Sequence, residues 1–196
     1  MTTVENTIPK RFKESAEVKS RFLKENLSRL LETIRLVSQA FEAGNKLFFF
    51  GNGGSAADAQ HFAAEFVNRY IMDRPPLPAI ALTTDTSILT SVSNDLAFDE
   101  IFAHQLRALG KEGDVAIGIS TSGNSSNVIK AFETARRMGL KTVALTGNDG
   151  GALANLADIC LVVPSKSTPR IQETHILVGH ILCEMVEHQL FFKVTP

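Results

Sequence analysis

Residues 46–66, KLFFFGNGGSAADAQHFAAEF, decide the fold of this chain. The apolar run from Lys46 to Phe50 ends at Gly51 and is too short for a helix, which indicates a buried strand. After a glycine-rich loop, a helical pattern extends from about Ser55 to Tyr70. A buried strand that passes through a tight loop into a helix is the repeating unit of a parallel α/β sheet.

The rest of the chain repeats this alternation. Apolar residues spaced three and four apart predict an N-terminal helix at about 12–43. Further strands are predicted at 79–82, 114–119, 142–146 and 159–163. Helices are predicted at 86–109, with a break near 94–95, and at 126–138, 151–156 and 168–191. The last helix is expected to be capped by Thr168, with Pro169 at its first position. We therefore expect one domain, residues 1–196, with an α/β fold: a three-layer α/β/α sandwich around a five-stranded parallel sheet.

Composition excludes several classes of protein. The chain has 20 Lys and Arg against 21 Asp and Glu, a net charge of −1, so it lacks the basic excess of a protein that binds nucleic acid through bulk charge. No run approaches the roughly 20 apolar residues of a membrane-spanning helix, and the N-terminus lacks the apolar core of a signal peptide. Two cysteines favour neither a disulfide scaffold nor a thiolate zinc site. A soluble cytoplasmic protein with no nucleic-acid or membrane partner is expected.

Near-neutrality also argues against a strongly anionic substrate, but the loops after the strands indicate otherwise. Ligands of parallel sheets bind beyond the carboxyl ends of the strands. Residues 120–126, STSGNSS, place hydroxyl groups at the start of a helix. Hydroxyls and backbone N–H groups can hold a phosphate monoester without a cation. A helix cap is the alternative interpretation, but a cap uses one or two such residues.

The loop at residues 51–58, GNGGSAAD, also opens a helix. Its three glycines let the backbone approach an anionic ligand closely, although a plain tight turn is the alternative. The loop lacks the lysine of a Walker motif and the dinucleotide fingerprint, so no nucleotide cofactor is expected.

Polar side chains form a stripe on the helix that follows. They fall within an arc of about 100° and comprise Asp58, His61, Glu65, Asn68 and Arg69. A solvated face is the alternative, but His61 and Glu65 are four residues apart and so share one patch. On the last helix, Gln172 and His180 lie about 80° apart in projection. A lone histidine in an apolar stretch is more often a satisfied core residue than a catalyst.

With these residues, the chain resembles the phosphoheptose isomerases, a family of sugar isomerase (SIS) domain enzymes. The matching segments are residues 51–70, 77–85, 93–95, 113–131, 143–151 and 170–181. The serine-rich loop alone is typical of the SIS superfamily, whereas HFAAE, ISTSGNS and RIQETH with a later histidine are more specific. The resemblance covers nearly the whole chain from about residue 15.

The resemblance implies a flavodoxin-like sheet in a single SIS domain. It also implies a homotetramer with active sites at subunit interfaces, to which the helix at 12–43 contributes contacts. The implied reaction converts sedoheptulose 7-phosphate to D-glycero-D-manno-heptose 7-phosphate through an enediol. This is the first step toward activated heptose for bacterial surface glycans such as lipopolysaccharide.

The resemblance also assigns roles to individual positions. Glu65 and His180 would be the catalytic acid/base pair. The phosphate would be held by Ser55, Ser120, Thr121, Ser122 and Ser125, and the rest of the substrate by Asn52, Gly53, Gly54, Glu65, Arg69, Asn94, Asp95 and Gln172. Zinc, found in metal-containing members, would be held by His61, Glu65, Gln172 and His180. One departure is Pro169, where some members carry an acidic residue.

Two other functions remain open from the sequence. One is a non-catalytic SIS protein that associates with a replication initiator; such proteins are expected to lack the acid at 65 and the histidine at 180. The other is an isomerase for another phosphosugar, because the residues alone do not fix the length of the sugar.

The spacing on the last helix adds a geometric expectation. On a regular helix, Gln172 and His180 are separated by about 12 Å along the axis, which is far for two ligands of one metal. Either the start of the helix is displaced or bent inward, or the two residues act from different subunits.

Overall fold

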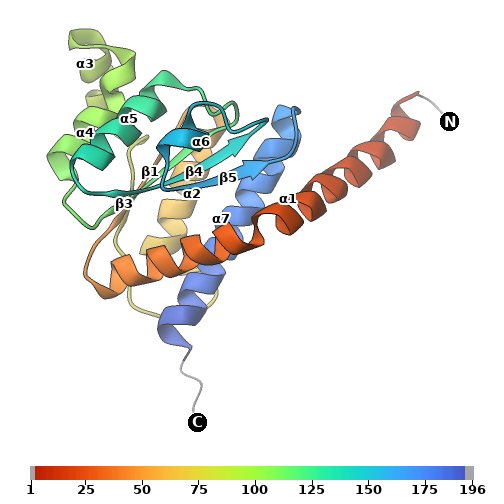
Figure 1. Ribbon diagram of the computed structural model, residues 1–196, viewed down its shortest axis with the longest axis horizontal. Coiled ribbons are helices and arrows are strands. Elements are labelled where there is room, and N and C mark those ends of the chain that lie inside the picture. Colours follow the sequence, from red (N-terminus) through yellow and green to blue (C-terminus); the bar gives the residue numbers. More distant parts are fainter. Residues whose placement is uncertain (1–2, 193–196) are drawn as a thin grey trace.

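A five-stranded parallel sheet forms the centre of the molecule (Figure 1). The computed structural model describes residues 3–192. The strands lie in the order β2-β1-β3-β4-β5, which is the flavodoxin-like order, and every neighbouring pair is parallel. Their bounds are β1 Leu47–Gly51, β2 Ala79–Ala81, β3 Val115–Ser120, β4 Lys141–Gly147 and β5 Ile159–Val163. The predicted sheet is confirmed, and each strand end lies within one residue of its predicted place.

Helices cover both faces of the sheet. One face carries α1 Thr3–Glu42, α2 Gly54–Val67 and α7 Thr168–Phe191; the other carries α3 Thr86–Asp95, the 3-10 helix η1 Phe98–Glu100, α4 Ile101–Leu109, α5 Ser126–Arg137 and α6 Leu153–Leu156. In β1, Leu47 and Phe49 join the core under α1, α2 and α7, while Phe48 and Phe50 join the opposite core. All four are fully buried, because side chains of a strand alternate between two covered faces.

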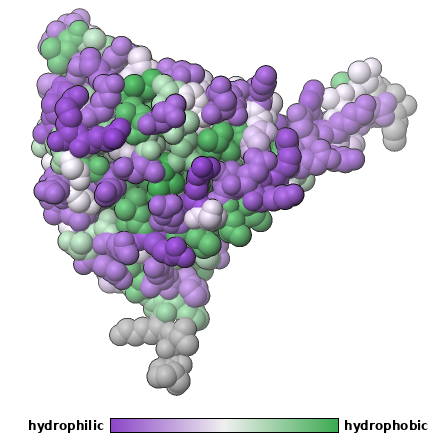
Figure 2. Space-filling view, in the orientation of Figure 1, coloured by the Kyte–Doolittle hydropathy of each residue, from purple (hydrophilic) through white to green (hydrophobic). Residues whose placement is uncertain are grey.

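Helix α1 begins at Thr3 and not near residue 12 as predicted. Its first turns project beyond the body of the molecule (Figure 1), and Val4, Ile8 and Phe12 are exposed there. The visible face of this projection is mainly hydrophilic (Figure 2). The prediction followed the apolar stripe that packs on the core, and buried residues of α1 start only at Val18. The helix continues without that packing, so the stripe underestimated its length.

Helix α2 ends at Val67, before its predicted end at Tyr70. The carboxylate of Glu187 in α7 accepts hydrogen bonds from the backbone N–H groups of residues 70–72 at 2.7–3.0 Å. Arg74 completes this arrangement through an ion pair with Glu187, Nε–Oε1 2.8 Å, in which both side chains are 1% exposed. The N–H groups that would continue the helix are therefore bound by a side chain more than a hundred residues away, which no local pattern reveals.

The remaining helices follow the predictions closely. The predicted break in residues 86–109 is confirmed as the gap between α3 and η1. Helix α5 ends one residue early, and α6 starts at Leu153, two residues late. The cap of α7 is Ser167, because Thr168 is already helical. None of the helices in residues 3–192 is both long enough and apolar enough to cross a membrane.

Candidate active site

The serine loop (residues 120–126) lies at the carboxyl edge of the sheet, between β3 and α5. Ser120 is the last residue of β3 and is 3% exposed. Its Oγ lies 2.9 Å from the Oγ of Ser125, which directly precedes α5. The structure therefore brings together Ser120 and Ser125, two hydroxyls of the predicted phosphate set, at a helix N-terminus, where free N–H groups favour an anion.

The glycine loop (residues 51–58) lies beside the serine loop, because β1 and β3 are neighbouring strands. A Cβ at Gly51 would lie 2.7 Å from the carbonyl oxygen of Ile119, and Gly53 has a φ of +57°, so both positions favour glycine. The side chains of Asn52 and Asn127 exchange two hydrogen bonds of 2.9 and 2.8 Å. Asn127 is 1% exposed and ties the glycine loop to α5; its position directly after the serine loop is the signal that could have identified it.

Helices α2 and α7 lie side by side and run in the same direction. They approach closely at Gly179, where any side chain would collide with the ring of Phe62. Nε2 of His180 lies 3.3 Å from Nε2 of His61, and the latter lies 3.1 Å from Oε1 of Glu65. The predicted acid/base pair, Glu65 and His180, therefore meets at His61 within one chain. We call these three residues the histidine–glutamate cluster.

Two further residues face the histidine–glutamate cluster. The ring of Tyr70 stacks on His180, with ring centroids 5.7 Å apart. Asp58, one turn before His61 on α2, is half-buried; burial raises the pKa of its carboxyl, and the imidazoles of His61 and His180 oppose this by lowering it. The polar stripe of α2 thus faces α7 over part of its length and is not a purely solvated surface.

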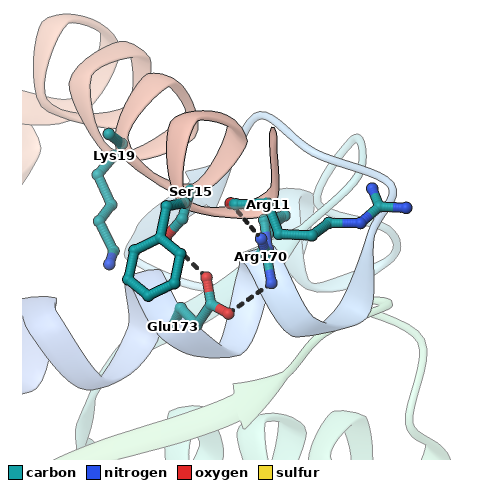
Figure 3. A pocket seen from close by; sticks show the side chains of 7 residues that line it. Arg11, Ser15, Lys19, Arg170 and Glu173 are labelled. Atoms are coloured by element: carbon teal, nitrogen blue, oxygen red, sulfur yellow. Dashed lines mark hydrogen bonds and ion pairs between the residues drawn. The ribbon is translucent and has the colours of Figure 1, made fainter. Parts of the chain in front are cut away.

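The first turn of α7 is attached to α1. Arg170 donates to the carbonyl oxygen of Arg11 at 2.7 Å and to Glu173 at 2.6 Å, and Glu173 accepts from Ser15 at 2.7 Å (Figure 3). A pocket of about 450 Å³ lies between these helices. In the RIQE segment, Arg170 and Glu173 therefore position the helix that carries Gln172.

Gln172 faces the other neighbour of α7, the start of α2. Its Nε2 would lie 2.7 Å from a Cβ at Gly54. His180 meets His61 about two turns further along the same helix, which is continuous from Thr168 to Phe191. No hydrogen bond among residues 3–192 joins Gln172 to His180 or to His61. Within residues 3–192, no three His, Cys, Asp or Glu side chains are arranged to hold a metal ion.

His175 on α7 has a structural role. Its side chain is 1% exposed, and Nε2 lies 2.9 Å from the carbonyl oxygen of Thr146 at the end of β4. Burial lowers the pKa of His175 to about 4, although the hydrogen bond to Thr146 acts in the opposite direction. The ring is therefore neutral near pH 7 and donates from Nε2.

Three predicted substrate residues lie elsewhere in the chain. Asn94 and Asp95 end α3, which packs mainly on η1 and α4, and their side chains bond to each other at 2.8 Å. Arg69 follows the end of α2, with its guanidinium 3.9 Å from the carboxylate of Asp73. Among the residues that the structure describes, no hydrogen bond or ion pair joins these three to the serine loop or to the histidine–glutamate cluster.

Known proteins resemble this chain in sequence and in structure. A model of the SIS domain family matches residues 11–147. Phosphoheptose isomerase of Thermodesulfovibrio yellowstonii is 53% identical over 188 residues, which cover 96% of this chain and 94% of that protein. Phosphoheptose isomerase 2 of Campylobacter jejuni is 51% identical, with 98% and 97% covered. The structure of phosphoheptose isomerase from Neisseria gonorrhoeae superposes with a TM-score of 0.89 at 44% identity, with 94% and 99% covered. That from Francisella tularensis has a TM-score of 0.91 at 40% identity, with 96% and 100% covered.

Proposed function

The chain belongs to the phosphoheptose isomerases of the SIS domain family, and from this premise we propose that it interconverts sedoheptulose 7-phosphate and D-glycero-D-manno-heptose 7-phosphate. The observation that carries the proposal is the contact of Glu65 and His180 through His61, on the helix α2 that the glycine loop opens. A non-catalytic, initiator-associating protein is expected to lack both residues, so their presence favours the enzyme. The cytoplasmic location and the surface-glycan pathway stay predictions.

Isomerisation requires a base at carbon and a proton carrier at oxygen. The reaction moves one proton from C1 of the ketose to C2 of the aldose through a cis-enediol, and a second proton between the two oxygens. We assign the carbon-bound proton to Glu65, which removes it from C1 and returns a proton to C2. His180 moves the proton between the oxygens, so both groups end the cycle in their starting states. A fixed phosphate keeps C1 and C2 within reach of these groups.

The phosphate would be held by neutral groups. Ser120 and Ser125 supply hydroxyls 2.9 Å apart, and the N-termini of α2 and α5 supply backbone N–H groups. Thr121, Ser122 and Ser55 complete the proposed set. A net charge of −1 is compatible with this site, because hydroxyls and helix termini add nothing to a charge count.

We also propose that the active site lies between subunits of a homotetramer. Among residues 3–192, no hydrogen bond or ion pair joins Arg69, Asn94 or Asp95 to the histidine–glutamate cluster, and Gln172 faces Gly54. Helix α1 offers a surface for such contacts, since Leu23, Leu27 and Leu31 are 43–52% exposed at four-residue spacing. An engineered monomer that kept full activity would contradict this arrangement.

The donor types of the histidine–glutamate cluster suit zinc, although the side chains of residues 3–192 are not arranged around a metal position in the structure. Two imidazole nitrogens and a carboxylate oxygen are donors that zinc prefers. Nε2 of His61 faces both Glu65 and His180, although a ring nitrogen carries only one proton or one lone pair. Two ligands of a tetrahedral zinc lie about 3.3–3.4 Å apart, and the two Nε2 atoms are 3.3 Å apart. We propose these three residues as ligands, with Gln172 as a fourth donor; bound zinc would polarise the sugar carbonyl.

Metal analysis tests this proposal. The purified protein should contain about one zinc per subunit, and His61→Ala should bind none. Zinc titration of metal-free protein without measurable binding contradicts the proposal. Because a zinc-bound carboxylate is a weaker base than a free one, a rate that depends wholly on zinc would contradict the assignment of the carbon-bound proton to Glu65.

Deuterium exchange tests the reaction itself. With sedoheptulose 7-phosphate in D₂O, the aldose product should carry deuterium at C2, because the proton on the base exchanges with solvent during the enediol stage. A product without deuterium would show that the proton on the base does not exchange with solvent, which contradicts this expectation. If the protein formed no aldose from sedoheptulose 7-phosphate but turned over a shorter phosphosugar, the result would favour an isomerase for another phosphosugar.

A further inference from the structure

The loop after β4, residues 147–152, packs against the back of the serine loop. A Cβ at Gly147 would lie 2.9 Å from the carbonyl oxygen of Thr121, and one at Gly151 would lie 2.6 Å from that of Ser122. Glycine at these positions lets two backbone segments touch without side chains between them. We call residues 147–152 the backing loop. It also contacts the side chain of Asn124, whose Oδ1 accepts a hydrogen bond from the backbone N–H of Ala152 at 2.9 Å.

Asn148 joins three of the loops at this edge of the sheet. Its Nδ2 donates to the carbonyl oxygen of Thr121 at 3.1 Å, and its backbone N–H donates to that of Ser165, after β5, at 3.0 Å. Its φ is +57°, and no other non-glycine residue in 3–192 has a positive φ. Asparagine tolerates this left-handed conformation better than most residues, at some cost in free energy.

The hydrogen bond to Thr121 determines how the next peptide group points. In a trans peptide, the carbonyl and the following N–H point in opposite directions. Because Asn148 holds the Thr121 carbonyl toward the backing loop, the N–H of Ser122 points away from that loop. No hydrogen bond within the described part of the chain uses this N–H. A free N–H in a loop of hydroxyl side chains is suited to donate to a phosphate oxygen.

We propose that Asn148 is a positioning residue for the phosphate site, which holds the Thr121–Ser122 peptide so that the Ser122 N–H donates to the substrate phosphate. Nothing in the composition of the serine loop itself indicates this role. The inference rests on the proposed function, because it needs a phosphate bound at the serine loop. Asn148 itself does not touch the substrate; it acts through the peptide that it holds.

Three substitutions of Asn148 distinguish the effect of losing its hydrogen bond to Thr121 from the effect of backbone strain at its positive φ. Asn148→Gly removes the amide but suits the positive φ, and Asn148→Asp keeps the shape but places an oxygen against the Thr121 carbonyl. Both should raise the KM for sedoheptulose 7-phosphate and the Ki for inorganic phosphate together, by about fivefold to tenfold, with kcat changed by less than about twofold. Asn148→Ala should raise KM equally and also lower Tm, because alanine is strained at this φ.

The matched control is Arg136→Ala. It removes an exposed side chain that donates to the Leu156 carbonyl at 3.3 Å, near the other end of α5, and should leave KM and Ki unchanged. Variants of Asn148 that lower Tm but keep KM and Ki within about twofold of wild type overturn the inference, since they show a structural role alone. Two results together would overturn both the phosphate site and the inference. The wild-type enzyme would turn over substrate without being inhibited by phosphate, and the Ser120→Ala variant would have the KM of wild type.

Discussion

Replacing Glu65 with glutamine should lower the turnover of sedoheptulose 7-phosphate by about a thousandfold, because loss of a general base costs about 10²–10⁴ in rate. The amide has nearly the shape of the carboxylate and can still accept a hydrogen bond from His61, whose Nε2 lies 3.1 Å away. It cannot take a proton from carbon. The measurement is the initial rate of aldose formation, together with deuterium incorporation at C2.

Two controls show whether the loss is chemical. Inorganic phosphate should raise the Tm of Glu65→Gln as it does that of wild type, because the serine loop is unchanged. Glu133→Gln, an exposed residue of α5 on the opposite face of the sheet, should keep the wild-type rate. Zinc content is measured in the same preparations, so that a lost base is distinguished from a lost metal. A near-wild-type rate for Glu65→Gln would show that another group is the base.

Glu187→Gln should lower the free energy of unfolding by about 3–5 kcal/mol, which corresponds to about 10 °C in Tm for a chain of this size. Glu187 and Arg74 are both 1% exposed, and the carboxylate also accepts three backbone N–H groups of residues 70–72. The variant leaves the guanidinium of Arg74 buried without an opposite charge, and one amide oxygen replaces two carboxylate oxygens. Urea denaturation and thermal melts measure the loss.

An exposed ion pair provides the matched control. Glu17 lies 3.9 Å from Lys13 on α1, with the two side chains 62% and 80% exposed. Glu17→Gln should change stability by less than about 1 kcal/mol, because water screens such pairs. The double variant Arg74→Met with Glu187→Met should be more stable than Glu187→Gln, since it leaves no unpaired buried charge. If Glu187→Gln and Glu17→Gln cost the same, the buried pair does not stabilise the fold.

Lowering the pH should weaken the stabilisation that the carboxylate of Glu187 provides. Burial alone would raise the pKa of Glu187, but the backbone N–H groups of residues 70–72 and Arg74 together hold that pKa below its ordinary value. A carboxyl with a lowered pKa stabilises the fold above its ordinary pKa of about 4.3, and this contribution is lost as the pH falls. Wild type should therefore lose more stability than Glu187→Gln between about pH 5 and pH 3.

Local patterns predicted the sheet well because β1, β3 and β4 are buried on both faces. Continuous apolar runs such as 47–50 are typical of strands that are covered on both faces. The ends of these strands were therefore predicted within one residue. Helix ends were predicted less well where partners are distant in sequence. The end of α2 depends on Glu187, and the start of α1 lies beyond the apolar stripe that packs on the core.

The same division holds for the candidate site. The hydroxyl-rich and glycine-rich loops are continuous segments, and the carboxyl ends of neighbouring parallel strands meet at one edge, so the sequence by itself determined that they would lie together. It also determined which residues match the family. Only the tertiary structure decided that His180 meets His61 in one chain while Gln172 faces Gly54, because these contacts depend on how closely α7 approaches α2 at Gly179. Only the structure connected Asn148 to Thr121, since a hydrogen bond between two strand-end loops depends on sheet order and not on spacing along the chain.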